Sequence, residues 1–284
     1  MSHPALVVIG HVGLATDRTA TGTTVTLGGS GYAVASAAAA LFDGQVGLAA
    51  QVGTDLDPAI ARGTGLNLDG LAVLPGTSAR FRIRQFDDGT RSFESDLGVA
   101  EHPRLDLFPE PYLHAKHVHL GTMPPQQQLT WLKFLRDKGS AAKISVDMFE
   151  HFVATENDAC RSAGDLADLL FMNQAEYAGL YGNDGHPKSP LVLKHGAGGA
   201  EFTSDGTTHR ARARRVREVD PVGAGEVLAG VFLALRARGL SAPQALRHAV
   251  AAATSSVTEF GVDGPRRAAA LARIRAQVAG SARS

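Results

Sequence analysis

The 284-residue sequence predicts an α/β protein with a doubly wound, mostly parallel sheet flanked by helices and a small antiparallel β lid. Two observations carry this prediction. Short apolar runs alternate with helix-like segments along most of the chain, as in parallel sheets whose strands are joined by crossover helices. One strictly alternating hairpin interrupts that rhythm. No linker, repeat or low-complexity tract divides the chain, so we expect one domain over residues 1–284 with lid strands at about 11–28 and 77–96.

Continuous apolar runs mark the expected strands of the parallel sheet. The first is ALVVIG at residues 5–10, which ends in glycine and suits a strand that is buried on both faces. The later strands are expected at QVGLAAQVG (45–53), HVHLG (117–121), KISVDM (143–148) and PLVLKHG (190–196). A hairpin over residues 199–216 follows them.

Helices are expected between these strands and at the C-terminal end. SGYAVASAAAALF (30–42) is short and Ala-rich, which suits a buried core helix better than a membrane span. The other expected helices are QQQLTWLKFLRDKG (126–139), GEVLAGVFLALRARG (225–239), SAPQALRHAVAAATSSVTEFG (241–261) and one within the tail at 266–284. Between them, AGDLADLLFMN (163–173) runs on to QAEYAGLYG (174–182).

The hairpin that interrupts the rhythm begins with ARFRIRQF at residues 79–86. Its strict alternation places Arg80, Arg82 and Arg84 on one face and apolar side chains on the other. DDGT then suits a turn and RSFES a return strand, which makes a hairpin exposed on one side. If this hairpin closes over a substrate, Arg82 is a candidate to grip a carboxylate or phosphate. The alternative is that these arginines face solvent or a partner subunit.

The composition restricts the class of protein. Lys plus Arg equals Asp plus Glu at 28 each, so the formal net charge is zero. The chain therefore has no overall positive charge that would attract nucleic acid or a membrane. The N-terminal MSHPALVVIG lacks the basic region and long apolar stretch of a signal peptide. A single cysteine, Cys160, allows no internal disulfide framework and suits a reducing compartment. We therefore expect a soluble cytoplasmic protein.

The segment DPVGAGEVLAG at residues 220–230 carries the chemistry. Gly223, Ala224 and Gly225 precede an apolar helix, and a helix that starts there exposes backbone amides to which an anion can come close. Glu226 lies on the first turn beside this anion hole, where a carboxylate is unfavourable unless it accepts a proton as a general base. The simpler alternative is a Gly-rich turn followed by an ordinary acidic residue.

Several segments, in order, resemble the ribokinase-like (PfkB-type) carbohydrate and nucleoside kinases. DPVGAGEVLAGVF resembles the C-terminal signature of that family, which usually reads Asp-Thr-x-Gly-Ala-Gly-Asp. The other matching segments are GGSGYAVASAAAALFDGQVGLAAQVGTD, TSARFRIRQFDDGTRSF, ISVDMF, LLFMNQAEYAGLYG and LVLKHGAGGAEF. The resemblance spans nearly the whole chain, and the ordered set is more specific than any one piece.

The resemblance implies a role for each matching residue. Gly223, Ala224 and Gly225 would form the anion hole for the transferred phosphoryl group, and Glu226 would deprotonate the substrate hydroxyl. Asn173 and Glu176 would organise Mg²⁺ and the ATP phosphates through water. The residues that would border or brace the nucleotide are Lys194, Gly196, Gly199 and Asp220. The residues that would contact the substrate are Asp17, Gly28 and Gly29, and the hairpin separately offers Arg82 as a candidate.

Four positions depart from the family pattern. Glu226 replaces Asp, which moves the carboxylate by about 1 Å, and a shift of that size can cost on the order of a hundredfold in rate. Lys194 stands where Thr is common. Ala33 replaces the Asn that usually follows the Gly pair, and Ala15 aligns with the usual substrate Asp, with Asp17 two residues later. The last two changes leave the substrate less certain than phosphorylation itself.

The sequence thus predicts an ATP- and Mg²⁺-dependent kinase for a hydroxyl of a sugar, cyclitol or nucleoside, forming a homodimer through the lid. The alternative is a catalytically weak or silent ligand-binding protein that keeps the kinase fold, because the base is Glu226.

Three other readings receive less support. GGSGYAV has Val34 at the third Gly of a dinucleotide fingerprint, which disfavours an oxidoreductase. His117 and His119 share a strand face, but the local sequence does not identify the further ligands that zinc needs. The arginines of HRARARRVR suit a solvated basic strand in a chain of zero net charge.

Overall fold

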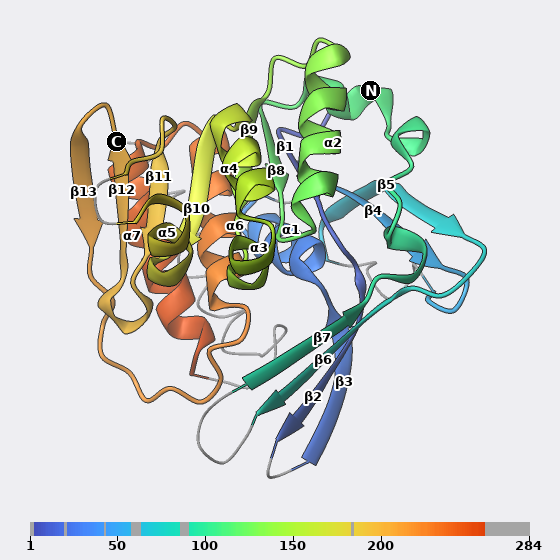
Figure 1. Cartoon of the computed structure of the whole chain (residues 1–284), viewed down its shortest axis with the longest axis horizontal. Coiled ribbons are helices and arrows are strands. Elements are labelled where there is room, and N and C mark those ends of the chain that lie inside the picture. Colours follow the sequence, from blue (N-terminus) through green and yellow to red (C-terminus); the bar gives the residue numbers. More distant parts are fainter. Residues whose placement is uncertain are drawn as a thin grey trace.

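The structure is a computed structural model that describes residues 3–19, 22–42, 44–57, 64–85, 91–182 and 185–258. These residues form two sheets and the helices around them (Figure 1). The strands of the large sheet are β1 (Leu6–Ile9), β4 (Val46–Gly53), β5 (Leu66–Leu74), β8 (His117–Leu120), β9 (Lys143–Asp147), β10 (Leu169–Asn173), β11 (Leu191–Lys194), β12 (Ala200–Ser204) and β13 (Thr207–Ala211). They pair in the order β13-β12-β11-β10-β9-β8-β1-β4-β5.

All pairs from β11 to β5 are parallel, and β12 and β13 add an antiparallel edge. The α-helices are α1 (Ser30–Ala39), α2 (Pro125–Asp137), α3 (Glu150–Thr155), α4 (Asn157–Leu166), α5 (Gln174–Tyr181), α6 (Ala224–Ala237) and α7 (Ala242–Ser256). The predicted fold class, a doubly wound, mostly parallel α/β sheet, is confirmed. None of the helices in the described ranges is long and apolar enough to cross a membrane.

The two faces of the large sheet carry separate cores because side chains alternate along each strand. In β1, Leu6 and Val8 pack with the apolar residues of α1, α6 and α7. Val7 and Ile9, on the opposite face, pack with residues of α2 and α4. Strand β1 is therefore buried on both faces, as its continuous apolar sequence predicted.

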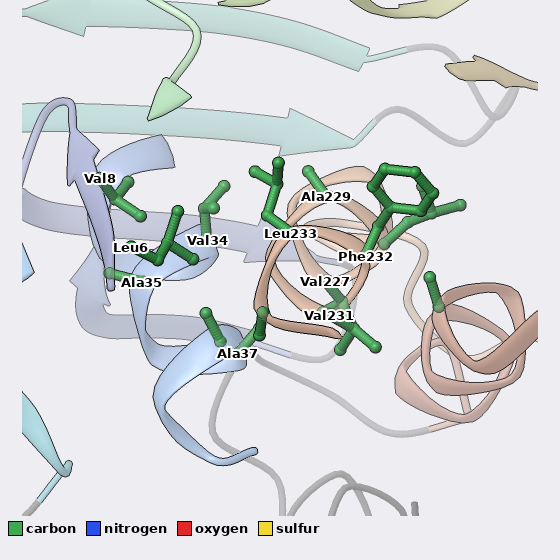
Figure 2. Packing of buried hydrophobic residues seen from close by; sticks show 14 of the residues in the cluster. Leu6, Val8, Val34, Ala35, Ala37, Val227, Ala229, Val231, Phe232 and Leu233 are labelled. Atoms are coloured by element: carbon green, nitrogen blue, oxygen red, sulfur yellow. The ribbon is translucent and has the colours of Figure 1, made fainter. Parts of the chain in front are cut away.

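Helices α1 and α6 share one buried apolar cluster, which Figure 2 shows with side chains such as Val34 of α1 and Leu233 of α6. A Cβ atom on Gly230 would lie 2.3 Å from the carbonyl oxygen of Val34 and 3.1 Å from the Cβ of Ala37. Glycine at this position therefore sets the distance between α1 and α6. Helix α6 is the helix that begins at the predicted anion hole.

We expect Gly230→Ala to destabilise the protein by about 1–3 kcal/mol, because α6 must move away from the backbone of α1. This loss exceeds the gain in helix propensity, which is about 1 kcal/mol at most. Thermal unfolding should show a fall in Tm of several degrees. The matched control is Gly164→Ala in α4, whose Cβ would meet side-chain atoms of Tyr181 and Met148 at 3.3 and 3.4 Å. An unchanged Tm for Gly230→Ala would contradict the packing argument.

The second sheet is the lid, which extends from the body in Figure 1. Its strands are β2 (Gly13–Thr19), β3 (Gly22–Gly28), β6 (Ala79–Gln85) and β7 (Arg91–Asp96), paired in the order β3-β2-β6-β7. These strands fall within the residues predicted for the lid. The pairs β2–β3 and β6–β7 are antiparallel, whereas the central pair β2–β6 is parallel. The lid therefore combines two antiparallel hairpins through one parallel contact.

One carboxylate fixes the base of β6. Asp55, which follows β4, accepts hydrogen bonds from the backbone N–H and the hydroxyl of Ser78, each at 2.7 Å, and from Arg80 at 2.7 Å. The Ser78 hydroxyl also accepts a hydrogen bond from the Gly53 amide at 2.8 Å. The hydrogen bonds from Ser78 lower the pKa of Asp55, so this carboxylate is charged at neutral pH and can accept all three bonds.

Three expectations about secondary structure are refined. Strand β5 was not predicted, because LNLDGLAVL carries Asn, Asp and Gly and is a partly buried edge strand rather than a continuous apolar run. Residues 163–182, left undivided, contain the end of α4, then β10 and α5. The expected turn at 87–90 and the tail helix at 266–284 lie outside the described residues.

Candidate active site

A cavity of about 570 Å³ lies where the carboxyl ends of the parallel strands meet the lid. Its wall includes lid residues such as Ala15 and Phe81 and, from the body, Thr122 after β8 and Glu226 of α6. The strands β4 and β8 pair on opposite sides of β1, so the cavity lies at the point where the strand order reverses. Open α/β sheets bind their ligands at this point.

The beginning of α6 has the geometry of an anion site. Gly223 is the N-cap with φ +79°, a left-handed conformation that favours glycine, and it lines the cavity. The Ala224 amide reaches the carbonyl oxygen of Pro221 at 3.3 Å, which is a weak bond. The amides of Gly223, Gly225 and Glu226 make no hydrogen bond to any described residue. Three backbone donors at a helix N-terminus are thus available to an anion.

Asp220 holds the turn before α6. This residue is 8% exposed, lines the cavity and accepts a hydrogen bond from the Val222 amide through Oδ1 at 3.0 Å. The amides of Val219 and Asp220 both donate to the carbonyl oxygen of Val257 at the end of α7, at 2.8 and 3.2 Å. The turn before α6 is therefore held by backbone hydrogen bonds to Val257 and by the Asp220 carboxylate.

Glu226 is on the first turn of α6, partly exposed, and forms part of the cavity wall. Its charge acts on two buried groups, Lys194 and Asp147, so these three residues belong to one electrostatic cluster. A carboxylate that faces the cavity beside free helix amides can take a proton from a bound hydroxyl group.

Lys194 and Asp147 form a buried ion pair beside the anion site. The Lys194 Nζ lies 2.7 Å from Asp147 Oδ1, and their side chains are 16% and 3% exposed. Burial opposes the charge of the lysine, but the carboxylates of Asp147 and Glu176 outweigh it and keep the pKa of Lys194 above its usual value. A Cβ on Gly225 would lie 3.6 Å from the Lys194 Nζ. The ammonium group therefore adjoins the amides that open α6.

Burial raises the pKa of the Asp147 carboxyl to about 6, although Lys194 acts in the opposite direction. The strand register explains why these groups meet. Asp147 ends β9, and Asn173 at the end of β10 is paired in register with Lys194 at the end of β11. The ends of three neighbouring parallel strands thus bring one cation and its carboxylate to the same edge of the sheet.

Asn173 and Glu176 form a reciprocal cap at the start of α5. The Asn173 side chain accepts a hydrogen bond from the Glu176 amide at 2.8 Å, and Glu176 Oε2 accepts one from the Asn173 amide at 2.6 Å. Burial raises the pKa of Glu176 to about 7, and Lys194 opposes this rise. The second carboxylate oxygen of Glu176 makes no hydrogen bond to a described residue.

This donor set fits a magnesium ion held mainly by phosphate and water. Glu176 and Asp147 are hard oxygen donors, and with Glu226 they place three carboxylates around the one ammonium group of Lys194. Within the described ranges, no three acidic, histidine or cysteine side chains converge closely enough to bind a metal by themselves. The arrangement therefore suits an ion that enters together with a polyphosphate rather than one held in a protein cage.

Gly196 and Gly199 bound the loop between β11 and β12. Both have positive φ, at +54° and +99°. A Cβ on Gly199 would lie 2.1 Å from the carbonyl oxygen of Ala211, so glycine is required there by packing. At Gly196 a Cβ would meet nothing within 4 Å, which leaves that side of the loop open. The predicted nucleotide-side loop thus lies directly after Lys194 with an open face.

The predicted substrate residues are only partly brought together. Gly28 and Gly29 line the cavity, and so do Ala15 and Ala33, whose methyl groups replace the polar side chains usual in the resembled family. Gly29 has φ +96°, and a Cβ there would lie 2.4 Å from the carbonyl oxygen of His11. Its close contact with the backbone of residue 11 is therefore a further reason for glycine.

Arg82 does not belong to the cavity wall. Neighbouring residues of a strand point to opposite faces, and in β6 it is Phe81 that lines the cavity. The Arg82 side chain is 65% exposed and lies 3.9 Å from Glu94 of β7. Arg80 is bound to Asp55 at the base of the lid. The side chain of Asp17 lies outside the described part of the structure, so its substrate role stays a prediction.

Several cavity residues were not found from the sequence. His11 follows β1, Asp96 ends β7 and Glu101 follows a short 3₁₀ helix, and all three line the cavity. Asp147, the partner of Lys194, was also not identified as a site residue. A usable signal existed for His11 and Asp147, because both lie at or just beyond the carboxyl ends of predicted parallel strands, where such sheets bind ligands.

One histidine of the possible zinc site, His119, lies in the core. His119 is fully buried and its Nδ1 lies 2.9 Å from the Ser145 hydroxyl. Burial lowers the pKa of His119 to about 3, so the ring is neutral and belongs to the core.

Comparison with known proteins agrees with this geometry. The chain is 28% identical over 271 residues to a cytidine kinase of Thermococcus kodakarensis, covering 90% of this chain and 97% of that relative. It is 29% identical over 227 residues to an ATP-dependent ribose-1-phosphate kinase of Halopiger xanaduensis, covering 73% and 72%. Among solved structures, a nucleoside kinase of Burkholderia thailandensis in complex with inosine has a TM-score of 0.81 at 19% identity and covers 96% of this chain and 98% of that one.

The family model described as pfkB family carbohydrate kinase matches residues 6–269. The resemblance inferred from the sequence motifs is therefore confirmed, as is the prediction of a phosphotransferase with a hydroxyl acceptor. The protein belongs to the pfkB family of carbohydrate kinases.

Proposed function

We propose that this protein transfers the γ-phosphoryl group of ATP, with Mg²⁺, to a hydroxyl group of an uncharged nucleoside. The observation that carries this proposal is the composition of the cavity wall. It combines the aromatic rings of Phe81, Phe149 and Phe152 with carboxylates. Aromatic rings suit stacking on a planar base, which a simple sugar lacks. Relatives named cytidine kinase and nucleoside kinase support the same acceptor class.

The carboxylates favour an acceptor without a phosphate group. Asp96, Glu101, Asp220 and Glu226 line the cavity, and none of its described lining residues is Lys or Arg. A further negative charge at about 4 Å from one carboxylate is disfavoured by about 4 kcal/mol at an effective dielectric constant of 20. A phosphorylated sugar would meet this repulsion, whereas a neutral nucleoside would not.

The site residues account for the transfer. The Glu226 carboxylate accepts the proton of the acceptor hydroxyl while the hydroxyl oxygen attacks the γ-phosphorus of ATP. The bond from the γ-phosphorus to its bridging oxygen breaks, and ADP leaves with the electron pair. The free amides of Gly223 and Gly225 bind the phosphoryl oxygens, and Lys194 places a positive charge beside them.

The remaining parts of the proposal concern the nucleotide and the assembly. Asn173 and Glu176 would hold Mg²⁺ through water, and the ion would neutralise the charge that develops on the phosphate oxygens. Gly196 and Gly199 would border ATP. A homodimer through the lid and a cytoplasmic location stay predictions, and Val25 of β3, 60% exposed, lies on the lid where such a partner would pack.

The test is a comparison of acceptors with the purified chain. ATP, Mg²⁺ and either cytidine, inosine, ribose or ribose 1-phosphate are supplied, and ADP and the phosphorylated product are measured. We expect turnover of at least one nucleoside, with kcat/KM at least tenfold above that for ribose 1-phosphate. Turnover of ribose 1-phosphate alone would contradict the proposal. Silence with every acceptor, while ligands still raise the Tm, would favour a binding protein.

A further inference from the structure

His11 lies where the chain passes from the large sheet into the lid, directly after Gly10 and two residues before β2. Its side chain is 7% exposed and forms part of the wall of the 570 Å³ cavity. The imidazole ring lies near that of Phe81 from β6, with centroids 6.5 Å apart and planes inclined by 28°. His11 thus contacts the lid on one side and the body on the other, at the acceptor end of the cavity.

Gln127 of α2 determines which nitrogen of His11 carries the proton. The Gln127 Nε2 donates hydrogen bonds to the carbonyl oxygens of Ala100 and Glu101 at 3.2 and 2.8 Å. These two acceptors fix the orientation of the amide, so its Oε1 faces His11 Nε2 at 3.1 Å. An amide oxygen can only accept, and His11 Nε2 must therefore donate.

The other ring nitrogen is then an unprotonated acceptor. Burial lowers the pKa of His11, so the ring is neutral at pH 7 and Nδ1 keeps its lone pair. No described residue hydrogen-bonds to this Nδ1. The nearby cavity positions 15 and 33 carry alanine methyl groups, which offer no donor. Because His11 lines the cavity, a free acceptor on its ring can take a hydrogen bond from a donor group of a bound molecule.

We propose that His11 is a specificity residue of the acceptor site, whose Nδ1 accepts a hydrogen bond from a hydroxyl or amine group of the acceptor in a tautomer fixed by Gln127. This inference rests on the proposed acceptor cavity, and it names the residue that replaces the polar contacts absent at Ala15 and Ala33. Gln127 acts as a positioning residue, because it touches His11 and the carbonyl groups of Ala100 and Glu101 rather than the acceptor.

The first measurement is the tautomer itself, which does not depend on catalysis. Nitrogen-15 spectra of the full chain at pH 7 should show His11 neutral, with Nε2 protonated and Nδ1 bare. Gln127→Met removes the oxygen that fixes the tautomer and should give a mixture of both forms. A wild-type His11 protonated on Nδ1, or charged at pH 7, would overturn the proposal whatever the acceptor proves to be.

The second measurement separates binding from chemistry with three variants. His11→Phe keeps an aromatic ring beside Phe81 but removes the acceptor, and it should raise KM for cytidine about tenfold while KM for ATP stays unchanged and kcat falls less than threefold. His11→Asn places an amide oxygen near the position of Nδ1 and should recover part of this loss. Gln127→Met should show an intermediate KM.

Acceptor analogues complete the test. The series is cytidine, 2′-deoxycytidine, 3′-deoxycytidine and the pyrimidin-2-one ribonucleoside that lacks the amine, and it is replaced by matching analogues if another acceptor is turned over. In the wild type, kcat/KM for one analogue should be about tenfold lower than for cytidine. In His11→Phe, kcat/KM for that analogue and for cytidine should be equal. Additive losses for every analogue would overturn the role of His11 while leaving the proposed kinase activity in place. Absence of any nucleoside turnover in the wild type would instead contradict the proposed function.

Discussion

Glu226→Gln should reduce kcat by about 10² to 10⁴-fold, because general-base catalysis typically contributes a factor of that size. The amide has nearly the same shape as the carboxylate but cannot accept the proton of the acceptor hydroxyl. Glu226 lines the cavity on the first turn of α6, beside three amides that have no described partner. Binding of ATP should change little, since the backbone donors of α6 remain. Steady-state kinetics and nucleotide titration of the same preparation measure both effects.

Glu226→Asp is the matched control. It keeps the carboxylate but withdraws it by about 1 Å, and a displacement of that size costs on the order of a hundredfold or less. We expect a rate between those of the wild type and Glu226→Gln. If Glu226→Gln retains most of the wild-type kcat, Glu226 is not the base, and the acidic residue is an ordinary member of the first turn.

Lys194→Met should lower kcat/KM for ATP by at least a hundredfold and also destabilise the fold. The Lys194 ammonium adjoins Gly225 and is bound to Asp147 at 2.7 Å, so its loss removes positive charge from the anion site. It also leaves the nearly buried Asp147 carboxylate without its partner, which typically costs about 3–5 kcal/mol. Kinetics with ATP and urea unfolding of the same variant report the two losses.

A double variant separates these losses. Lys194→Met combined with Asp147→Asn removes both charges of the pair and should restore much of the stability, because no unpaired charge remains in the core. Activity should stay low, since the positive charge beside Gly225 is still missing. Lys194→Arg keeps the charge in a larger side chain and should retain more activity than Lys194→Met. Recovery of activity in the double variant would show that Lys194 serves the fold alone.

Local patterns were sufficient for most of the strands and for the opening of α6. The apolar run of β1 and the Gly-Ala-Gly sequence before Glu226 each follow from contacts within a few residues. The undivided stretch at 163–182 marks the limit of this approach, because its apolar composition suits both β10 and the helices around it. Strand β5 was missed because an edge strand needs no continuous apolar run.

The electrostatic groups of the site depend on contacts distant in sequence. His11 and Gln127 are 116 residues apart, and Lys194 and Asp147 are 47 apart. Neither pair could be assigned without the strand order, which brings the ends of β1, β9 and β11 to one edge of the sheet. Arg82 illustrates the opposite case, in which the alternation was correctly identified but the face that meets the cavity was not fixed by the sequence.

Asp55 has a mechanical consequence for the lid. Asp55 accepts two hydrogen bonds from Ser78 and one from Arg80, so the start of β6 is restrained relative to the body. With its base restrained in this way, the lid would move by bending along its strands rather than by rotating about its base. Access to the cavity would therefore depend on the bending stiffness of the strands beyond residue 79. Loss of the hydrogen bonds to Asp55 would instead allow the lid to rotate about its base.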